Sequence, residues 1–461
     1  MKNIAKVWRS STAFLLSAFS FLILITSCSN ELDDTLQPVN NGNLQFVVSD
    51  FPAFGESGLT RAIGTQDEGK TAWENGDQII VTLISQKYGE QAAALTYNGS
   101  SWSTEASLSY LENETPSVSV FYAPCYEVTE EGTMQLRSGM QLGMTEYLSG
   151  NYEIENGIMT ITFEGAIRTY SRLRIAGLAN QTLTVTTTNF TPAGATEVAT
   201  AAYTLTADKN GNAFLYGIFA EGATVSVKQG DVILKDYTFT AEKNPNGTEH
   251  NKSYALDATP VIDGTLGGKA TAEESDITAL VEQLKAYVDN GITTIIVPGS
   301  EPALIEMDSW TNTAIGEAIY RLSGSDDYDE NNPYNGKIDL ILQDVTEIVD
   351  QEFYSAWALN SITLPKVIKI GDEAFHRTWF LKTITFESVL TEVNETGGVM
   401  FAQVGKEVDG CNLFINCGQM KENSVPTPDL ATNTWKFKFE NEFKSITLTH
   451  TGACDECKAN Q

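Results

Sequence analysis

The chain has 461 residues and a formal net charge of −31, from 60 acidic and 29 basic residues. This length predicts two or three domains, and the hydrophobic share of 42% supplies enough apolar surface for their cores. The negative charge repels nucleic acids and anionic lipid surfaces, so we exclude nucleic-acid binding and expect a globular, exported body.

The first segment of the chain has the features of an export signal. Basic residues precede the apolar run 13–25, which ends in small residues followed by Cys28. The run is short for a bilayer span, and a cysteine occupies the processing position. We therefore predict a lipoprotein signal peptide over residues 1–27, with Cys28 as the lipidated (palmitate-carrying) new N-terminus. The alternatives are an ordinary signal peptide and an N-terminal membrane helix.

Residues 28–43 are polar, acidic and contain Gly and Pro, so we expect a tether that buries nothing. The acidic run next to Cys28 resembles the signal that sends lipoproteins of Bacteroidota to the outer leaflet. This resemblance implies a lipid-anchored protein exposed at the cell outer membrane. The alternative is a plain spacer that leaves the protein facing the periplasm.

Short apolar segments that alternate with polar residues recur between residues 44 and 258. Side chains of a strand point alternately to its two faces, so this pattern predicts half-buried strands. Asn-Gly pairs lie between several of them and predict tight turns, because glycine accepts the positive φ that such turns need. We expect two small β-sandwiches, over residues 44–150 and 151–258.

Three motifs mark the first of these regions: Leu-Thr-Arg-Ala at 59–62, Trp-Glu-Asn-Gly-Asp-Gln-Ile at 73–79, and the segment 95–102 that ends in Trp102. Together they resemble the opening of the fimbrillin-like (Mfa-like) lipoproteins, which implies partnership with fimbrial subunits. We interpret Trp73 and Trp102 as core residues.

In the fimbrillin-like family an arginine-specific protease cuts between the first strands and opens a groove that a strand of another subunit fills. Arg61 is the matching position in this chain. The alternative interpretation of Arg61 is a solvent-exposed loop arginine. The resemblance thus leaves open whether the chain is cut and whether it assembles into fimbriae.

Residues 259–274 contain Pro and several Gly residues and predict a linker. We expect a helix that begins at a capping Ser275 and ends near Gly291, because its apolar residues recur on one face. A strand follows at 292–298, and a second helix is predicted near 312–322. The first helix suits the N-terminal cap of the domain that follows.

An internal repeat aligns residues 345–364 with 367–386, so that Phe353 matches Phe375 and Ile362 matches Ile384. Units of this length stack because none covers its own apolar side. The run 370–375 with Leu381 resembles BspA-like leucine-rich repeats, although Ala356 and Thr378 stand where that family has cysteine. We therefore expect a short α/β leucine-rich-repeat solenoid over residues 275–450, in a chain that is mainly β.

Trp357 and Trp379 occupy equivalent positions in the two units and should lie side by side. Tryptophan is enriched at binding hot spots, so the pair is a candidate surface for a protein or glycan ligand. The alternative is that both side chains pack inside the domain.

No pattern in the sequence proposes catalytic residues, a cofactor or a metal site. The chain has three histidines, no G-x-S-x-G elbow and no H-E-x-x-H pair. The acidic loop 326–331 lacks the glycine and closing glutamate of a calcium loop, so we interpret it as solvated. In the tail 451–461 a Cys-x-x-Cys pair predicts disulfides more readily than a zinc cluster. The candidate disulfide residues are Cys411, Cys417, Cys454 and Cys457.

These observations predict a non-enzymatic surface lipoprotein for adhesion or recognition, with the repeat domain binding a protein or glycan, in the role of a fimbrial tip or accessory subunit. One alternative is a lipoprotein that captures glycans for a nutrient uptake system. Another is an enzyme whose residues meet only in the folded chain.

Overall fold

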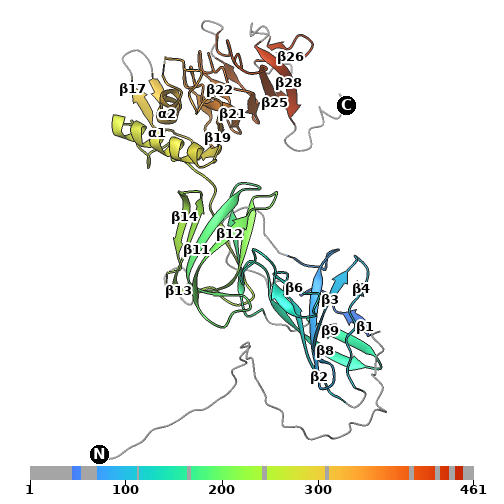
Figure 1. Cartoon of the computed structure of the whole chain (residues 1–461). Helices are drawn as coiled ribbons and strands as arrows, with labels where there is room; N and C mark the ends of the chain where they lie inside the picture. The colour runs from blue at the N-terminus through green and yellow to red at the C-terminus, as the bar shows by residue number, and fades with distance from the viewer. Residues whose placement is uncertain are drawn as a thin grey trace, which may run out of the picture.

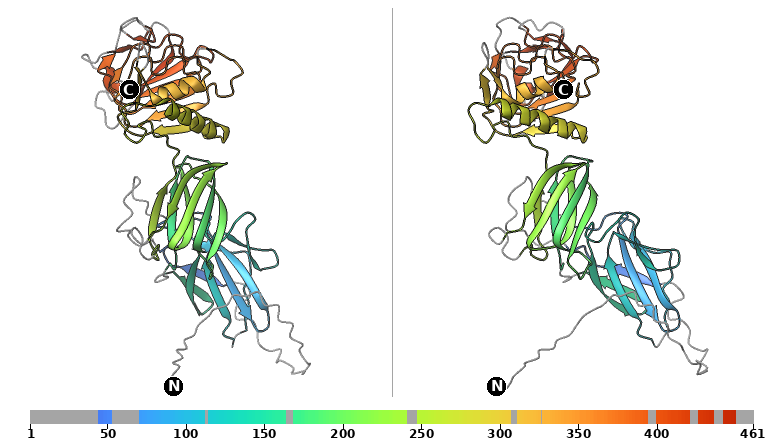
Figure 2. Two further views of the ribbon diagram at one scale, coloured as in Figure 1. Left: turned by 90° about the vertical axis from the view of Figure 1, so that its left-hand side faces the viewer. Right: turned by 60° about the vertical axis from the view of Figure 1, so that its left-hand side comes forward.

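The computed structural model describes residues 44–52, 70–111, 114–163, 168–240, 247–306, 311–325, 327–393, 399–420, 426–435 and 442–449. Over these residues the chain is mainly β, with two α-helices, which confirms that part of the prediction. Figure 1 shows three bodies, which we call the first (44–163), second (168–258) and third (259–449). They lie end to end, with the second in the middle (Figure 2). No helix of the described residues is long and apolar enough to cross a membrane.

The first body contains a seven-stranded sheet in the order β1-β9-β8-β5-β2-β3-β4 and a separate β6-β7 hairpin. β1 pairs in parallel with β9, and the other neighbours are antiparallel. The strands are β1 (Gln45–Val48), β2 (Gln78–Ser85), β3 (Gly89–Tyr97), β4 (Trp102–Ser103), β5 (Ser117–Tyr122), β6 (Tyr126–Val128), β7 (Met134–Leu136), β8 (Leu148–Glu155) and β9 (Ile158–Thr162).

The first sheet extends beyond residue 150, where we had placed the end of the first sandwich. Asn156 and Gly157 have φ values of 52° and 79° and form the tight turn of the β8-β9 hairpin. Because β9 lies between β8 and β1, the whole hairpin belongs to the first sheet. A turn motif read from sequence locates a hairpin but does not say which sheet it joins.

Aromatic rings fill the first core. Trp73 donates its indole N–H to the carbonyl of Ser49 at 2.8 Å and packs edge-on against Trp102 at 4.9 Å. Phe51 and Tyr122 contact the same ring at 4.8 and 5.2 Å. These contacts place Trp73 and Trp102 in the packing of the first body.

The second body is a six-stranded sheet, β12-β11-β13-β10-β15, with β14 paired to β13. The 18-residue β13 alternates buried and half-buried side chains and pairs with β10 through its first half and with β14 through its second. The strands are β10 (Ser171–Ala176), β11 (Thr182–Pro192), β12 (Ala199–Thr206), β13 (Asn212–Gln229), β14 (Val232–Thr238) and β15 (Ser253–Asp257).

The third body contains a parallel six-stranded sheet, β16-β19-β21-β23-β25-β28, and a parallel three-stranded sheet, β20-β22-β24. Small antiparallel pairs, β17-β18 and β26-β27, lie beside them. The elements are α1 (Glu274–Asp289), β16 (Thr294–Val297), β17 (Leu304–Glu306), β18 (Thr311–Thr313), α2 (Ala314–Leu322), β19 (Ile338–Leu342), β20 (Glu347–Ile348), β21 (Leu359–Leu364), β22 (Lys369–Ile370), β23 (Thr383–Phe386), β24 (Glu392–Val393), β25 (Cys411–Asn416), the 3-10 helix η1 (Cys417–Met420), β26 (Pro428–Asp429), β27 (Thr434–Trp435) and β28 (Phe443–Thr449).

The strand register follows the sequence repeat. Ile362 pairs with Ile384 in the large sheet and Ile348 pairs with Ile370 in the small one. Phe353, Phe375 and Phe401 stack inside at 5.6 and 5.5 Å, all but fully buried. Each unit therefore buries its apolar side against the next, as expected for stacked repeats.

Both predicted helices are present. α1 buries Ile277, Leu280, Leu284 and Tyr287, and α2 buries most of its residues. The predicted cap of α1 was wrong, since Glu273 is the N-cap and forms a capping box with Asp276.

The segment 259–274 is not a linker. Ile262 is fully buried in the third core and donates its N–H to the carbonyl of Ile296 on β16, at 2.9 Å. Ala258 is fully buried in the second core, so only residues 259–261 lie between the two cores. The carboxylate of Asp263 accepts N–H groups of Thr265 and Gly267, which folds the glycine-containing stretch into a compact turn.

Candidate functional site

The tryptophan pair lies inside the third body. Trp357 is fully buried, and Trp379 is 9% exposed. Their rings stack at 5.2 Å, and Tyr328 covers both edge-on at 5.0 and 4.9 Å. The indole N–H of Trp357 donates to the carbonyl of Arg377 at 2.9 Å. The prediction that Trp357 and Trp379 form a ligand surface is corrected: the ladder packs the repeat units together.

The large parallel sheet has one face in the core and one face turned outward. Its inward side chains, such as Ile362 and Ile384, are fully buried, whereas the alternate side chains are half-buried or exposed. We call the outward side the sheet face. Two register rows form it: Thr294, Asp339, Ser361, Thr383, Asn412 and Ser445 in one, and Ile296, Ile341, Thr363, Thr385, Phe414 and Thr447 in the other.

The sheet face is nearly uncharged. Asp339 is the one ionisable residue of the two rows, and it accepts hydrogen bonds from Asn360 at 2.7 Å and Ser361 at 2.6 Å. The hydroxyl groups of Thr363 and Thr385 make no hydrogen bond with any residue that the structure describes. These hydroxyls are therefore available to a ligand.

Apolar side chains flank these hydroxyls on the sheet face. Ile296 and Ile341 lie to one side of the central threonines and Phe414 to the other. None of the three packs against the third core. A surface with apolar contacts and a few unpaired polar groups can bind a neutral partner. Sequence reasoning missed this face because it used only the inward isoleucines; the polar residues between them were the available signal.

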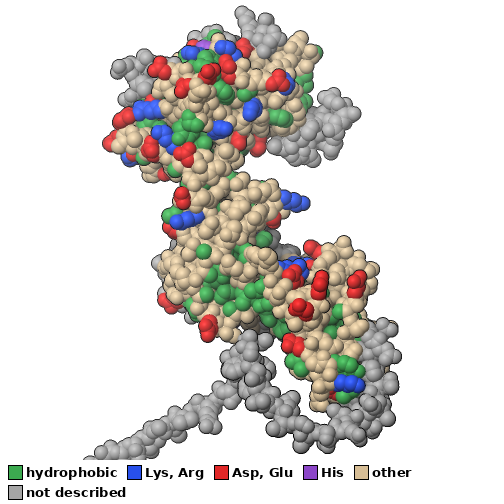
Figure 3. All heavy atoms as spheres, in the orientation of Figure 1, with side chains coloured by type: hydrophobic (Ala, Val, Ile, Leu, Met, Phe, Trp, Pro, Cys, Tyr) green, Lys and Arg blue, Asp and Glu red, His purple; other side chains and the backbone are tan. Residues whose placement is uncertain are grey.

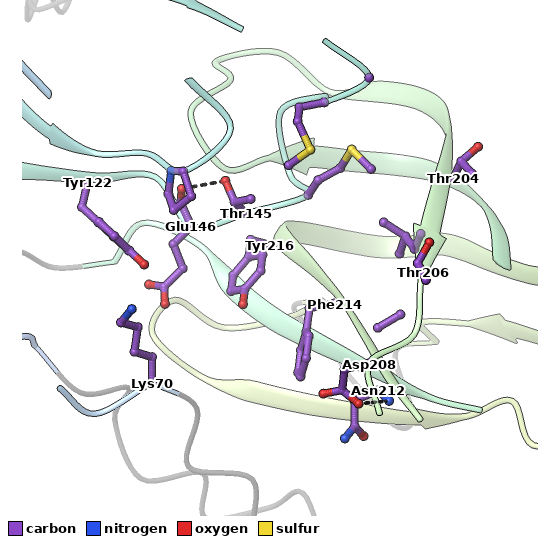
Figure 4. A pocket seen from close by; sticks show the side chains of 16 residues that line it. Lys70, Tyr122, Thr145, Glu146, Thr204, Thr206, Asp208, Asn212, Phe214 and Tyr216 are labelled. Atoms are coloured by element: carbon purple, nitrogen blue, oxygen red, sulfur yellow. Dashed lines mark hydrogen bonds between the residues drawn. The ribbon is translucent and has the colours of Figure 1, made fainter. Parts of the chain in front are cut away.

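A cleft of about 550 Å³ lies between the first and second bodies. Figure 4 shows Glu146 near Tyr122, Lys70 and Tyr216, with Asp208 beside Asn212 on the second body. Glu146 accepts hydrogen bonds from buried Arg168 and Tyr170, each at 2.9 Å.

The charged side chains of this cleft serve the fold. Asp208 accepts the backbone N–H groups of Asn210 and Asn212 at 2.8 and 2.9 Å, and Lys70 pairs with Asp77 at 2.5 Å. Each carboxylate therefore holds a turn or a junction, and the cleft is a joint between bodies.

Glu352 is the most perturbed carboxyl group of the third body. It is 1% exposed, and burial raises its pKa to about 7. Its carboxylate oxygens accept the hydroxyl of Thr313 at 2.8 Å and the N–H of Val349 at 3.0 Å. Thr313 also caps α2 by accepting the N–H of Gly316. Glu352 therefore joins the repeat to the second helix.

The other predicted site residues divide into two groups. Cys411 is buried on β25, forms no disulfide with a described residue, and burial raises its thiol pKa to about 12. Cys417 is buried in η1. Cys28, Arg61, Cys454 and Cys457 lie outside the described residues, so lipidation, cleavage and disulfide pairing stay predictions.

Across the described parts of the chain, no group of three or more His, Cys, Asp or Glu side chains is placed to hold a metal ion. Of the acidic loop, Asp329 accepts the N–H of Asn331 at 2.9 Å, which is a local turn contact.

No protein-family model and no curated protein matches the chain. Among solved structures, a candidate cell adhesion protein from Bacteroides fragilis aligns with 47% of this chain and 93% of its own, at 13% identity and a TM-score of 0.26. A shaft pilin, SpaA, from Lactobacillus rhamnosus aligns with 40% of this chain and 93% of its own, at 12% identity and a TM-score of 0.15. At these TM-scores neither likeness indicates a function for this chain.

Proposed function

We propose that this chain is a surface-anchored recognition lipoprotein. Two fimbrillin-like β-sandwiches form a stalk, and a leucine-rich-repeat solenoid at the far end binds a protein or glycan. The single observation that supports this most is the placement of the stacked parallel repeat, with its open sheet face, at the end of the molecule opposite the first body (Figure 1).

Contacts at the first joint support a stiff stalk. Tyr216 of the second body donates its N–H to the carbonyl of Gly143 of the first at 2.7 Å. Met144 of the first body packs on the second core, and Ala193 of the second is buried in the first core. Side chains exchanged between cores hold two bodies in one orientation.

The second joint is also packed. The tip of the β13-β14 hairpin donates the N–H of Asp231 to Asn290 at the end of α1, at 2.8 Å. Val232 and Leu234 of the same hairpin pack against the third core. A stalk with two packed joints carries its end body at a fixed distance from its anchor.

The proposal also includes a membrane anchor. Cys28 carries the lipid, the acidic tether directs the chain to the outer face of the outer membrane, and cleavage at Arg61 would prepare it for fimbrial partners. A repeat body at the far end suits a tip or accessory subunit better than a shaft subunit. N-terminal sequencing of the membrane-bound and protease-shaved forms tests all three points together.

The sheet face is tested with the full mature chain on a panel of immobilised neutral oligosaccharides and secreted proteins. We expect binding to at least one surface, lost in the double variant Thr363→Arg and Thr385→Arg, which places large charges over the central rows. The matched control is Thr71→Arg with Thr206→Arg, at exposed positions of the other two bodies.

Absence of binding to every surface would contradict the recognition role, and so would equal binding by the sheet-face and control variants. Breakdown of an immobilised polymer would establish an enzyme instead. Binding to glycans alone, together with poor growth on that glycan when the protein is deleted, would identify the nutrient-capture alternative.

A further inference from the structure

A second cluster of polar and aromatic side chains lies on the third body, in the turns that precede strands β21 and β23. Equivalent residues of successive units stack there, so that the Tyr354 ring meets the His376 ring edge-on at 5.4 Å. Arg377 follows in the same column as Ser355 and Gln403, all three with φ between 51° and 62°. Figure 3 shows a histidine with Lys or Arg side chains beside it at the surface of the third body.

Arg377 is held by aromatic rings. Its guanidinium donates to the hydroxyl of Tyr354 at 3.1 Å and lies 5.9 Å from the Tyr354 ring and 5.2 Å from the Trp379 ring. Cation–π contacts of this kind orient a guanidinium without neutralising it. The remaining N–H donors of Arg377 are not bonded to any described residue.

Arg377 also lacks an acidic partner among the described residues, although acidic side chains outnumber basic ones two to one in this chain. By contrast, Arg137, Arg168 and Arg321 each lie within 4.0 Å of a carboxylate. Arg377 is half-buried and keeps unbonded N–H donors in a chain rich in carboxylates. This arrangement suits the binding of an external anionic group.

Two further side chains complete the cluster. The Lys406 ammonium lies 4.5 Å from the Trp379 ring, so two positive charges flank one indole. In the next unit, the position equivalent to Trp357 and Trp379 is Gly405, which has no side chain. The side chain of Lys406 therefore lies beside the Trp379 ring. The Nδ1 atom of His376 is buried without a hydrogen-bond partner among the described residues.

We infer that Arg377 and Lys406, with His376 beside them, form a binding site, separate from the sheet face, for a single carboxylate on a sugar ring, such as a terminal uronic acid of a glycan. The Arg377 fork matches a carboxylate with two parallel hydrogen bonds. The half-buried Tyr354 ring, which orients Arg377, suits the apolar face of a sugar.

A single charge fits better than a polyanion or an acidic peptide. The chain carries a net charge of −31. Glu407 pairs with the Lys406 ammonium at 3.8 Å, and the carbonyl of Glu373 accepts the N–H of His376 at 3.0 Å, so each additional negative charge on a ligand meets repulsion from these two residues. A terminal acidic sugar presents one carboxylate and otherwise neutral hydroxyl groups.

The test is calorimetric titration of the full mature chain with a uronic-acid-terminated oligosaccharide, its carboxyl-reduced neutral counterpart and an acidic peptide. We expect the uronate to bind at least about tenfold more tightly than either. Arg377→Gln should lose this preference, and Arg377→Lys should retain only part of it, because an ammonium lacks the fork. The charge-matched control is Lys366→Gln, at an exposed lysine paired with Asp344.

Arg377→Gln should fold, because Gln403 adopts the same backbone conformation at the equivalent position, with φ of 62°. Equal binding of the neutral oligosaccharide, or tighter binding of the acidic peptide, would overturn the inference. So would unchanged uronate binding in a folded Arg377→Gln protein. If Thr363→Arg with Thr385→Arg abolishes partner binding while uronate binding persists, the two sites are separate, and failure at one does not follow from failure at the other.

Discussion

Glu352 is a carboxyl group that the fold buries at the contact between α2 and the repeat. An unfolded glutamate has its ordinary pKa of 4.5, whereas the folded one titrates at about 7. Between these values the folded state holds a proton that the unfolded state has lost. The free energy of unfolding of the third body should therefore fall as pH rises through this window and level off above it.

Glu352→Gln should remove this pH dependence, because a neutral amide can donate to Thr313 and accept the N–H of Val349. At pH 8 we expect the variant to be more stable by up to about 3 kcal/mol. Urea unfolding of the third body at pH 5 and pH 8, followed by hydrogen exchange, measures the change. Glu301→Gln, at an exposed site, is the control; the idea fails if both variants keep the wild-type pH profile.

Trp357 should matter for stability. Trp357→Ala leaves a large void between stacked units and removes one of the two hydrogen bonds to the Arg377 carbonyl, so we expect a loss of about 3–5 kcal/mol in the third body. Hydrogen exchange in urea should show earlier opening of the third body alone. Trp102→Ala, in the first core, should instead lower the stability of the first body. Normal stability with lost ligand binding would return Trp357 to the role of a contact residue.

The sequence shows which residues occupy equivalent positions of the repeat. It does not show whether their side chains point into the core or toward solvent. The match of Trp357 with Trp379 predicted neighbouring rings, and the rings do stack. Their burial depends on Tyr328, which reaches them from a loop before β19, and no spacing rule shows that contact. The cluster around Arg377 was overlooked because Arg377 and Lys406 are far apart in sequence and meet only across one indole ring.

The tip of the β13-β14 hairpin forms part of the second joint. One added methyl group at this tip tests the contact. A Cβ at Gly230 would lie 2.3 Å from the Oδ1 atom of Asn290, which already accepts the N–H of Asp231. Gly222 has a similar positive φ, with nothing within 4 Å of an added Cβ.

Gly230→Ala should therefore displace Asn290, whereas Gly222→Ala should carry only the backbone cost of an alanine at positive φ, about 1 kcal/mol. We expect faster hydrogen exchange at Asp231 in the first variant alone. Identical exchange in both variants would mean that the hairpin tip does not dock on α1.

The sequence could predict whether a segment forms a helix, a strand or a turn where the local pattern decides it. It could not predict which sheet or which body that segment joins. The apolar face of α1 and the turn at Asn156-Gly157 are local features, and both appear in the structure. Assignment of β9 to the first sheet depends on pairing with β1, over a hundred residues away in sequence. The segment 259–274 looked like a linker because its glycines suit a loop, but Ile262 pairs with Ile296 of β16, a tertiary contact that no local pattern shows.

At the scale of the whole molecule, the packed joints convert three bodies into one extended body. A flexible linker would let the third body sample many positions, and its sheet face would then have no fixed distance from the first body. Residues 259–261 are too few for such freedom, and the hairpin contacts at Asn290 restrict rotation about them. In the function that we propose, the stalk would thus determine where recognition occurs.

Small-angle X-ray scattering of the mature chain tests this rigidity. The wild-type curve should fit one extended conformer, whereas a Gly/Ser insertion of about ten residues after Thr259 should shorten the mean end-to-end distance and broaden its distribution. The tether is identical in both proteins, so its contribution cancels in the comparison. The same insertion after Asn98, in an exposed hairpin turn of the first body, is the control and should leave the curve nearly unchanged. If the wild-type and Thr259-insertion curves coincide, the bodies already move independently, and a recognition surface at a fixed height is wrong even if the third body binds its ligand.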